Sequence, residues 1–134
     1  MRGLGETRGR WTAVLLPDVR SWVGRGFGEV DYYLTQLLSG HGYFREFLRK
    51  IGKRSVGNCP HCSGIRDDAH HTFFECERWG RIRRDLEERV GQWVPERFQS
   101  IMLSGRAQWN AVAMFTRAVL TLKRRDMDGE EDNP

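Results

Sequence analysis

The stretch "CPHCSGIRDDAHHTFFEC", residues 59–76, decides how this chain folds. Its first two cysteines, Cys59 and Cys62, are separated by two residues, so both thiolates can reach one ion from a single tight turn. A third cysteine, Cys76, follows two adjacent histidines. Three cysteines and one histidine form a closed tetrahedral ligand set, which is typical of structural zinc sites. We therefore predict a zinc-pinned loop, and in so small a chain zinc would contribute directly to folding.

Two spacings are compatible with this site, because either histidine of the adjacent pair can supply the fourth ligand. His71 gives C-x2-C-x8-H-x4-C, and His70 gives C-x2-C-x7-H-x5-C. Neighbouring residues of a helix point about 100° apart, so only one of the two faces the ion easily. We favour His71, because H-x4-C is a recurrent ending of CCHC knuckles. His61, inside the CPHC turn, is a weaker competitor because its neighbours already reach the metal. The predicted metal ligands are Cys59, Cys62, His71 and Cys76.

Composition limits the class of protein. The chain has 134 residues and is 39% hydrophobic, which suits one domain with a modest core. Its three cysteines all lie between residues 59 and 76, a poor framework for disulfides and a pattern that indicates a reducing compartment. No apolar run at the N-terminus or elsewhere has the length of a signal peptide or a membrane span. We therefore expect a soluble, intracellular protein without membrane contact.

Apolar residues recur at helical spacing along most of the chain, and no long strand-like alternation is present, so we predict a mostly α fold: a small helical domain with a zinc-pinned CCHC loop. Glycines at Gly40 and Gly52 predict two helix ends, and Asp18 and Asp67 or Asp68 predict N-caps. The predicted units are a flexible leader at 1–10, a helical C-terminal domain at 11–126 with the zinc knuckle at 59–76, and a disordered acidic tail at 127–134.

The last predicted helix, Gln108 to about Arg125, carries apolar residues on two sides. A helix of this kind is either buried in its own domain or held by a partner.

Three blocks of the sequence match one family. They are "TQLLSGHGYF" at 35–44, "HTFFECERW" at 71–79 and "QWNAVAMFTRAVLTLKRR" at 108–125. Over roughly residues 9–126 the chain closely resembles the C-terminal part of reverse transcriptases from non-LTR (LINE-like) retrotransposons of insects. The resemblance implies the same four zinc ligands, with His71 as the histidine. The family usually has an acidic residue directly before that histidine, where this chain has His70.

The resemblance also implies a function. The family carries out RNA-templated DNA synthesis (an RNA-directed DNA polymerase) primed at a nicked target, with endonuclease and polymerase domains upstream and an F/Y-x-D-D motif that this chain lacks. We therefore expect no catalytic residue here and no enzyme activity of the chain alone. We expect a C-terminal zinc- and nucleic-acid-binding segment whose partners are RNA and/or DNA and the upstream polymerase domain, in the nucleus or cytoplasm as part of a ribonucleoprotein.

Arginines around the zinc loop are the predicted nucleic-acid contacts, because a guanidinium binds phosphate with a planar fork and aromatic rings stack on bases. An alternative places the tryptophan in the core and pairs the arginines with Asp85, Glu87 and Glu88. A second alternative is a structural or protein-interaction zinc module that binds no nucleic acid, whose last helix docks on the polymerase domain. The predicted nucleic-acid-binding residues are Arg66, Arg78, Trp79, Arg81, Arg83 and Arg84.

Overall fold

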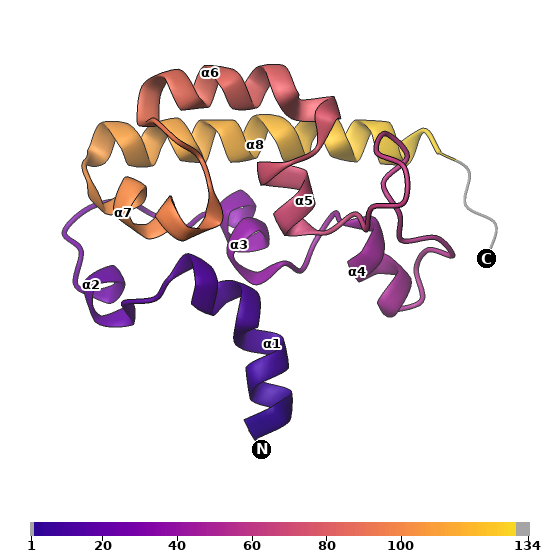
Figure 1. Cartoon of the computed structure of the whole chain (residues 1–134), viewed down its shortest axis with the longest axis horizontal. Helices are drawn as coiled ribbons and strands as arrows, with labels where there is room; N and C mark the ends of the chain where they lie inside the picture. Colours follow the sequence, from indigo (N-terminus) through magenta and orange to yellow (C-terminus); the bar gives the residue numbers. More distant parts are fainter. Residues whose placement is uncertain (1, 131–134) are drawn as a thin grey trace.

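The computed structural model describes residues 2–130, with side chains from residue 9 onward. Within this part the chain is mostly α-helical, as predicted, and its only β-contact is one isolated bridge between Asn58 and Arg66. The α-helices in chain order are α1 (Arg2–Leu15), α2 (Val19–Val23), α3 (Tyr32–Ser39), α4 (Arg45–Lys50), α5 (Ala69–Phe74), α6 (Gly80–Val90), α7 (Phe98–Leu103) and α8 (Arg106–Asp128) (Figure 1). Two 3-10 turns, η1 (Glu77–Trp79) and η2 (Pro95–Arg97), precede α6 and α7.

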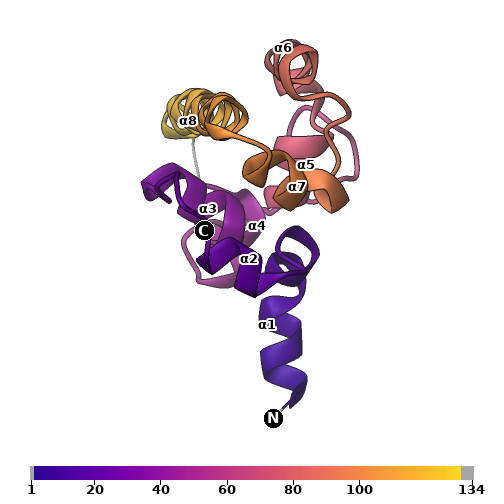
Figure 2. The ribbon, with the colours of Figure 1, turned by 90° about the vertical axis from the view of Figure 1, so that its left-hand side faces the viewer.

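Helix α8 forms the spine of the molecule. Figure 1 shows it running across the domain, and α6, α7 and α3 pack against it. Figure 2 looks along α8, with α6 beside it and α3 below it. Val112 and Val119 on one side are fully buried, and Ala111 and Phe115 on the other are 8% and 4% exposed. The two apolar sides predicted from the sequence are therefore both covered within this chain.

Aromatic rings connect the helices through the core. The Trp93 ring stacks on Phe74 at 4.6 Å between centroids and meets the edge of Phe115 at 5.6 Å. Its Nε1–H donates to the carbonyl oxygen of Phe73 at 2.9 Å, which satisfies the polar atom of a 2%-exposed side chain. At the other end of α8, Trp109 stacks on Trp22 at 5.1 Å. This line of rings fixes α2, α5 and the segment after α6 on the spine.

The predicted helix boundaries in the middle of the chain are confirmed. The Asp18 carboxylate accepts from the Ser21 amide at the start of α2, and Gly40 ends α3 with a φ of 76°. Of the two candidate caps before α5, Asp68 takes the role, with its carboxylate accepting from the His71 amide. The preceding aspartate, Asp67, does not cap the helix and instead pairs with Arg45 and Lys123.

Both chain ends are more regular than the sequence indicated. Helix α1 begins at Arg2, inside the predicted leader, and its second half is anchored because Trp11 Nε1–H donates to the Leu37 carbonyl oxygen. Helix α8 continues to Asp128, inside the predicted tail, and Glu130 pairs with Arg45 and with Arg54. These arginines are distant in sequence, so local composition gave no sign of the contacts. Residue 1 and residues 131–134 lie outside the described part. No helix within residues 2–130 is both long and apolar enough to cross a membrane.

Asp67 is a buried ionic junction between the loop at residues 53–68, α4, α5 and α8. Its side chain is 1% exposed and accepts from four donor groups: the Arg45 amide at 3.0 Å, Arg45 Nη1 at 2.8 Å, Thr72 Oγ1 at 3.1 Å and Lys123 Nζ at 2.7 Å. Burial alone would raise the pKa of this carboxyl, but Lys123 and these hydrogen bonds lower it below its usual range. Asp67 therefore stays ionised inside the protein.

Replacing Asp67→Asn is expected to cost about 3–5 kcal/mol of unfolding free energy, because it leaves the buried charge of Lys123 without its main partner. Urea denaturation of the zinc-saturated protein measures this loss. The matched control is Asp68→Asn, which alters the neighbouring acid but keeps an equally good N-cap, so its expected change is below about 0.5 kcal/mol. Equal stabilities of the two variants would contradict the role given to Asp67.

Candidate metal centre

The four side chains of the predicted CCHC site come together in the fold. Sulfur atoms of Cys59, Cys62 and Cys76 and a ring nitrogen of His71 all lie within 4.8 Å of one another. Three of these residues are buried and Cys62 is half-buried. The Sγ atoms of Cys59 and Cys76 are 3.7 Å apart, close to the separation of about 3.8 Å that two thiolates have around a tetrahedral zinc with Zn–S bonds near 2.3 Å.

A short turn presents the first two cysteines. The Cys59 amide donates to the Ile65 carbonyl oxygen at 2.8 Å, and the Ile65 amide donates back to the Cys62 carbonyl oxygen at 3.3 Å. Gly64 makes the reversal possible with a φ of +76°, in the left-handed region that favours glycine. The His61 amide points inward and donates to Cys59 Sγ at 3.4 Å, while the His61 side chain remains exposed and outside the cluster.

Helix α5 delivers the other two ligands. Asp68 starts the helix, so the first turn places His71 on the side of the turn that carries the cysteines. The helix then ends at Phe74, and the Cys76 amide donates to the His71 carbonyl oxygen at 2.7 Å. This return of the chain brings the Cys76 sulfur back to the side of the helix where His71 lies.

The structure separates the two adjacent histidines. His71 is 5% exposed, and neither of its ring nitrogens has a hydrogen-bond partner among the described residues. A buried imidazole without partners is costly unless another group, such as a metal ion, completes it. The His70 ring instead stacks on Trp11 at 5.2 Å, its side chain is 48% exposed, and its Nε2 lies 3.5 Å from Glu75 Oε2. The fold thus joins His71 to the cysteines and leaves His70 apart.

Electrostatics around the thiols also favour a cation. Burial raises the pKa of the Cys76 thiol to about 12, with further increases from neighbouring Cys59 and Cys62. Three thiolates this close together would repel one another, whereas a divalent cation would hold them deprotonated. Arg83 supports the same charge balance, because its Nη2 donates to the Cys76 carbonyl oxygen at 2.9 Å while its Nη1 is buried without a partner among the described residues.

The predicted nucleic-acid-binding residues do not form one exposed set. Trp79, the last residue of η1, is only 2% exposed, so its ring is not available to stack on a base. Arg78 covers that ring and pairs with Asp126 at 3.0 Å, and Arg83 belongs to the metal centre. The remaining three, Arg66, Arg81 and Arg84, are exposed. Within the described residues, no ion pair joins the predicted arginines to Asp85, Glu87 or Glu88, as the alternative required.

Comparisons with known proteins give three insect relatives. The chain is 26% identical over 113 residues to "Retrovirus-related Pol polyprotein from type-1 retrotransposable element R1 4" of Nasonia vitripennis, which covers 84% of this chain and 29% of the polyprotein. It is 36% identical over 59 residues to the R1 Pol polyprotein of Popillia japonica, covering 42% and 24%. It is 31% identical over 88 residues to the R1 2 Pol polyprotein of Nasonia vitripennis, covering 65% and 21%. This chain is related to a region of R1 retrotransposon Pol polyproteins.

The relationship agrees with the resemblance drawn from the sequence motifs. The chain spans less than a third of the length of each of these polyproteins. No protein-family model and no solved structure matches the chain.

Proposed function

We propose that this chain is the C-terminal zinc-binding and nucleic-acid-binding segment of a non-LTR retrotransposon reverse transcriptase. The observation that carries the proposal is that three cysteines converge with one buried histidine, whose ring nitrogens have no hydrogen-bond partner among the described residues. Relationship to R1 Pol polyproteins supports the retrotransposon context. In this proposal zinc has a structural role, because four protein ligands complete a tetrahedral shell and leave no open position for water.

Zinc would be held by two sequence segments, the CPHC turn and the segment from His71 in α5 to Cys76. The proposed ligands are Cys59, Cys62, His71 and Cys76. Three thiolates and one neutral imidazole around Zn²⁺ carry one net negative charge. The guanidinium of Arg83 does not contact the ion, but it donates to the Cys76 carbonyl oxygen and its positive charge would balance the negative charge of the site.

Zinc content distinguishes the two histidines. His71→Ala is expected to lose stoichiometric zinc after dialysis against a mild chelator, because it removes one ligand of four, while His70→Ala keeps one zinc per chain. Elemental analysis of the purified proteins measures both. Because His71→Ala can also unfold the chain, His71→Cys is a third variant, and its four thiolates should retain zinc. Loss of zinc from His70→Ala alone would overturn the ligand assignment.

Nucleic-acid binding is proposed to use exposed arginines that have no carboxylate partner among the described residues. Arg66 lies in the zinc loop, and Arg81 and Arg84 lie on α6. Arg78 and Arg83 are engaged within the protein, so they contribute less to phosphate binding than the sequence indicated. The formal net charge of +4 favours an anionic partner.

Salt dependence tests this part of the proposal. Fluorescence anisotropy of the zinc-loaded chain with labelled RNA and DNA should show binding that weakens steeply between about 50 and 200 mM salt, because each phosphate contact releases counterions. The double variant Arg81→Gln/Arg84→Gln should lower the slope of log K against log salt by about 1.4 for single strands. Folded, zinc-loaded protein that binds neither RNA nor DNA would instead support the alternative of a structural or protein-interaction module.

A further inference from the structure

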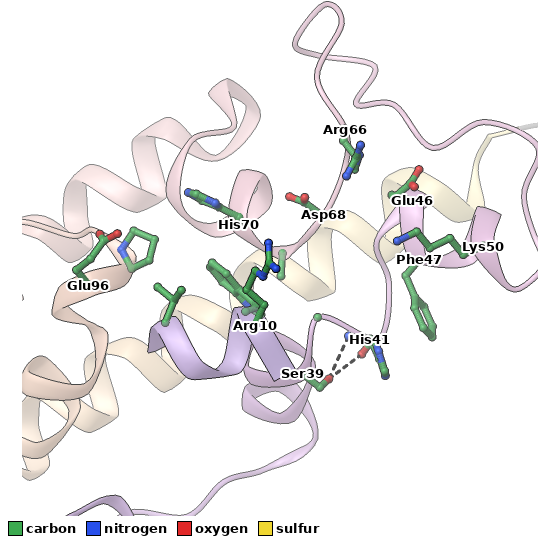
Figure 3. Close-up of a pocket in the computed structure, with 15 residues that line it drawn as sticks. Arg10, Ser39, His41, Glu46, Phe47, Lys50, Arg66, Asp68, His70 and Glu96 are labelled. Atoms are coloured by element: carbon green, nitrogen blue, oxygen red, sulfur yellow. Dashed lines mark hydrogen bonds between the residues drawn. The ribbon is translucent and has the colours of Figure 1, made fainter. Parts of the chain in front are cut away.

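A groove of about 660 Å³ lies beside the metal centre and was not anticipated from the sequence. Its walls come from α1, the turn after α3, α4 and the start of α5 (Figure 3). Figure 3 shows Arg10 near the middle, with His70 on one side and Lys50 and Phe47 on the other. We call this the α1–α4 groove. None of its lining residues is a proposed zinc ligand.

Two stacked ring pairs line the groove. The His70 ring lies on Trp11 at 5.2 Å with an interplanar angle of 21°, and the His41 ring lies on Phe47 at 4.6 Å with an angle of 17°. In each pair one ring is half-buried and holds the imidazole against the wall, while the imidazole itself is exposed. Flat faces fixed in this way are platforms on which a further planar group can stack.

Three cations surround these platforms. Arg10, Lys50 and Arg66 line the groove, are exposed, and form no ion pair with a described carboxylate. Among the acidic residues that line the groove, Glu46 accepts a bidentate pair of hydrogen bonds from the Arg49 guanidinium, at 2.9 and 2.8 Å. Asp68 accepts the α5 cap bond, so Glu96 at one end is the remaining acid that lines the groove.

We propose that the α1–α4 groove binds a single-stranded segment of nucleic acid, with bases stacked on His41 and His70 and phosphates bound by Arg10, Lys50 and Arg66. This inference rests on the proposed function and gives it a specific binding site. Stacked platforms interleaved with exposed cations match the alternation of bases and phosphates along a single strand. A duplex hides the faces of its bases, so it can use the cations but not the platforms.

Proton NMR of the imidazole rings tests contact directly. The chain has four histidines, which serve as internal probes. On titration of the zinc-loaded chain with an oligouridylate of about ten nucleotides, ring signals of His41 and His70 should shift together, whereas exposed His61 at the tip of the zinc turn should not. Shifts of His61 without shifts of His41 and His70 would place the nucleic acid on the zinc loop and overturn the groove.

Affinity variants give an independent test. His41→Ala and His70→Ala should each weaken oligouridylate binding roughly tenfold through lost stacking, and His61→Ala is the matched control with no expected change. Arg10→Gln/Lys50→Gln should reduce the salt slope by about 1.4. These groove variants should affect a duplex of the same sequence less than the single strand.

The outcomes separate the two proposals. Wild-type chain that binds no oligonucleotide would reject the proposed function and the groove together. Binding that Arg81→Gln/Arg84→Gln weakens, but that the groove variants leave unchanged, would overturn the groove alone. Equal losses for the single strand and the duplex would contradict the stacking role of the two imidazoles.

Discussion

The buried carboxylate of Asp67 is kept ionised by hydrogen bonds and ion pairs with groups from three helices. These contacts constrain how the helices and the loop are arranged. The donors to Asp67 come from α4, from α5 and from the C-terminal part of α8, where Lys123 lies 56 residues away in sequence. All of these donors reach the Asp67 carboxylate only when the loop enters the core at one position and in one orientation. Asp67 therefore fixes where the loop sits on the spine, and the residues on either side of it, the CPHC turn and α5, are aligned as a consequence.

The Asp67 junction and the proposed zinc site each stabilise a different part of the irregular segment at residues 53–68. Residues 53–68 contain little regular structure and few large apolar side chains, so hydrophobic burial alone supports them weakly. Asp67 ties the end of the loop to α8 through Lys123, and zinc would tie Cys59 and Cys62 to α5. With the loop fixed, α4 and α5 become walls of the α1–α4 groove, so the same constraints shape the proposed nucleic-acid site.

Local signals in the sequence were sufficient for most helices, and the choice of His71 as zinc ligand stays a prediction that agrees with its place beside the three cysteines. The cap at Asp18 and the left-handed Gly40 depend on neighbours within four residues and could be predicted, whereas the cap of α5 was predicted only as Asp67 or Asp68. The role of Asp67 could not be predicted, because two adjacent aspartates have the same capping potential and only distant Lys123 separates them. The same reason applies to Glu130, whose partners lie in and after α4.

The proposed zinc site has a closed shell of three cysteines and His71 around one ion. Zinc K-edge X-ray absorption of the purified chain measures that ligand shell without any substitution. The proposed ligand set predicts three sulfur neighbours of zinc at about 2.3 Å and one nitrogen neighbour at about 2.0–2.1 Å, with no coordinated water. A shell with two or fewer sulfurs, or with oxygen in place of the nitrogen, would contradict it.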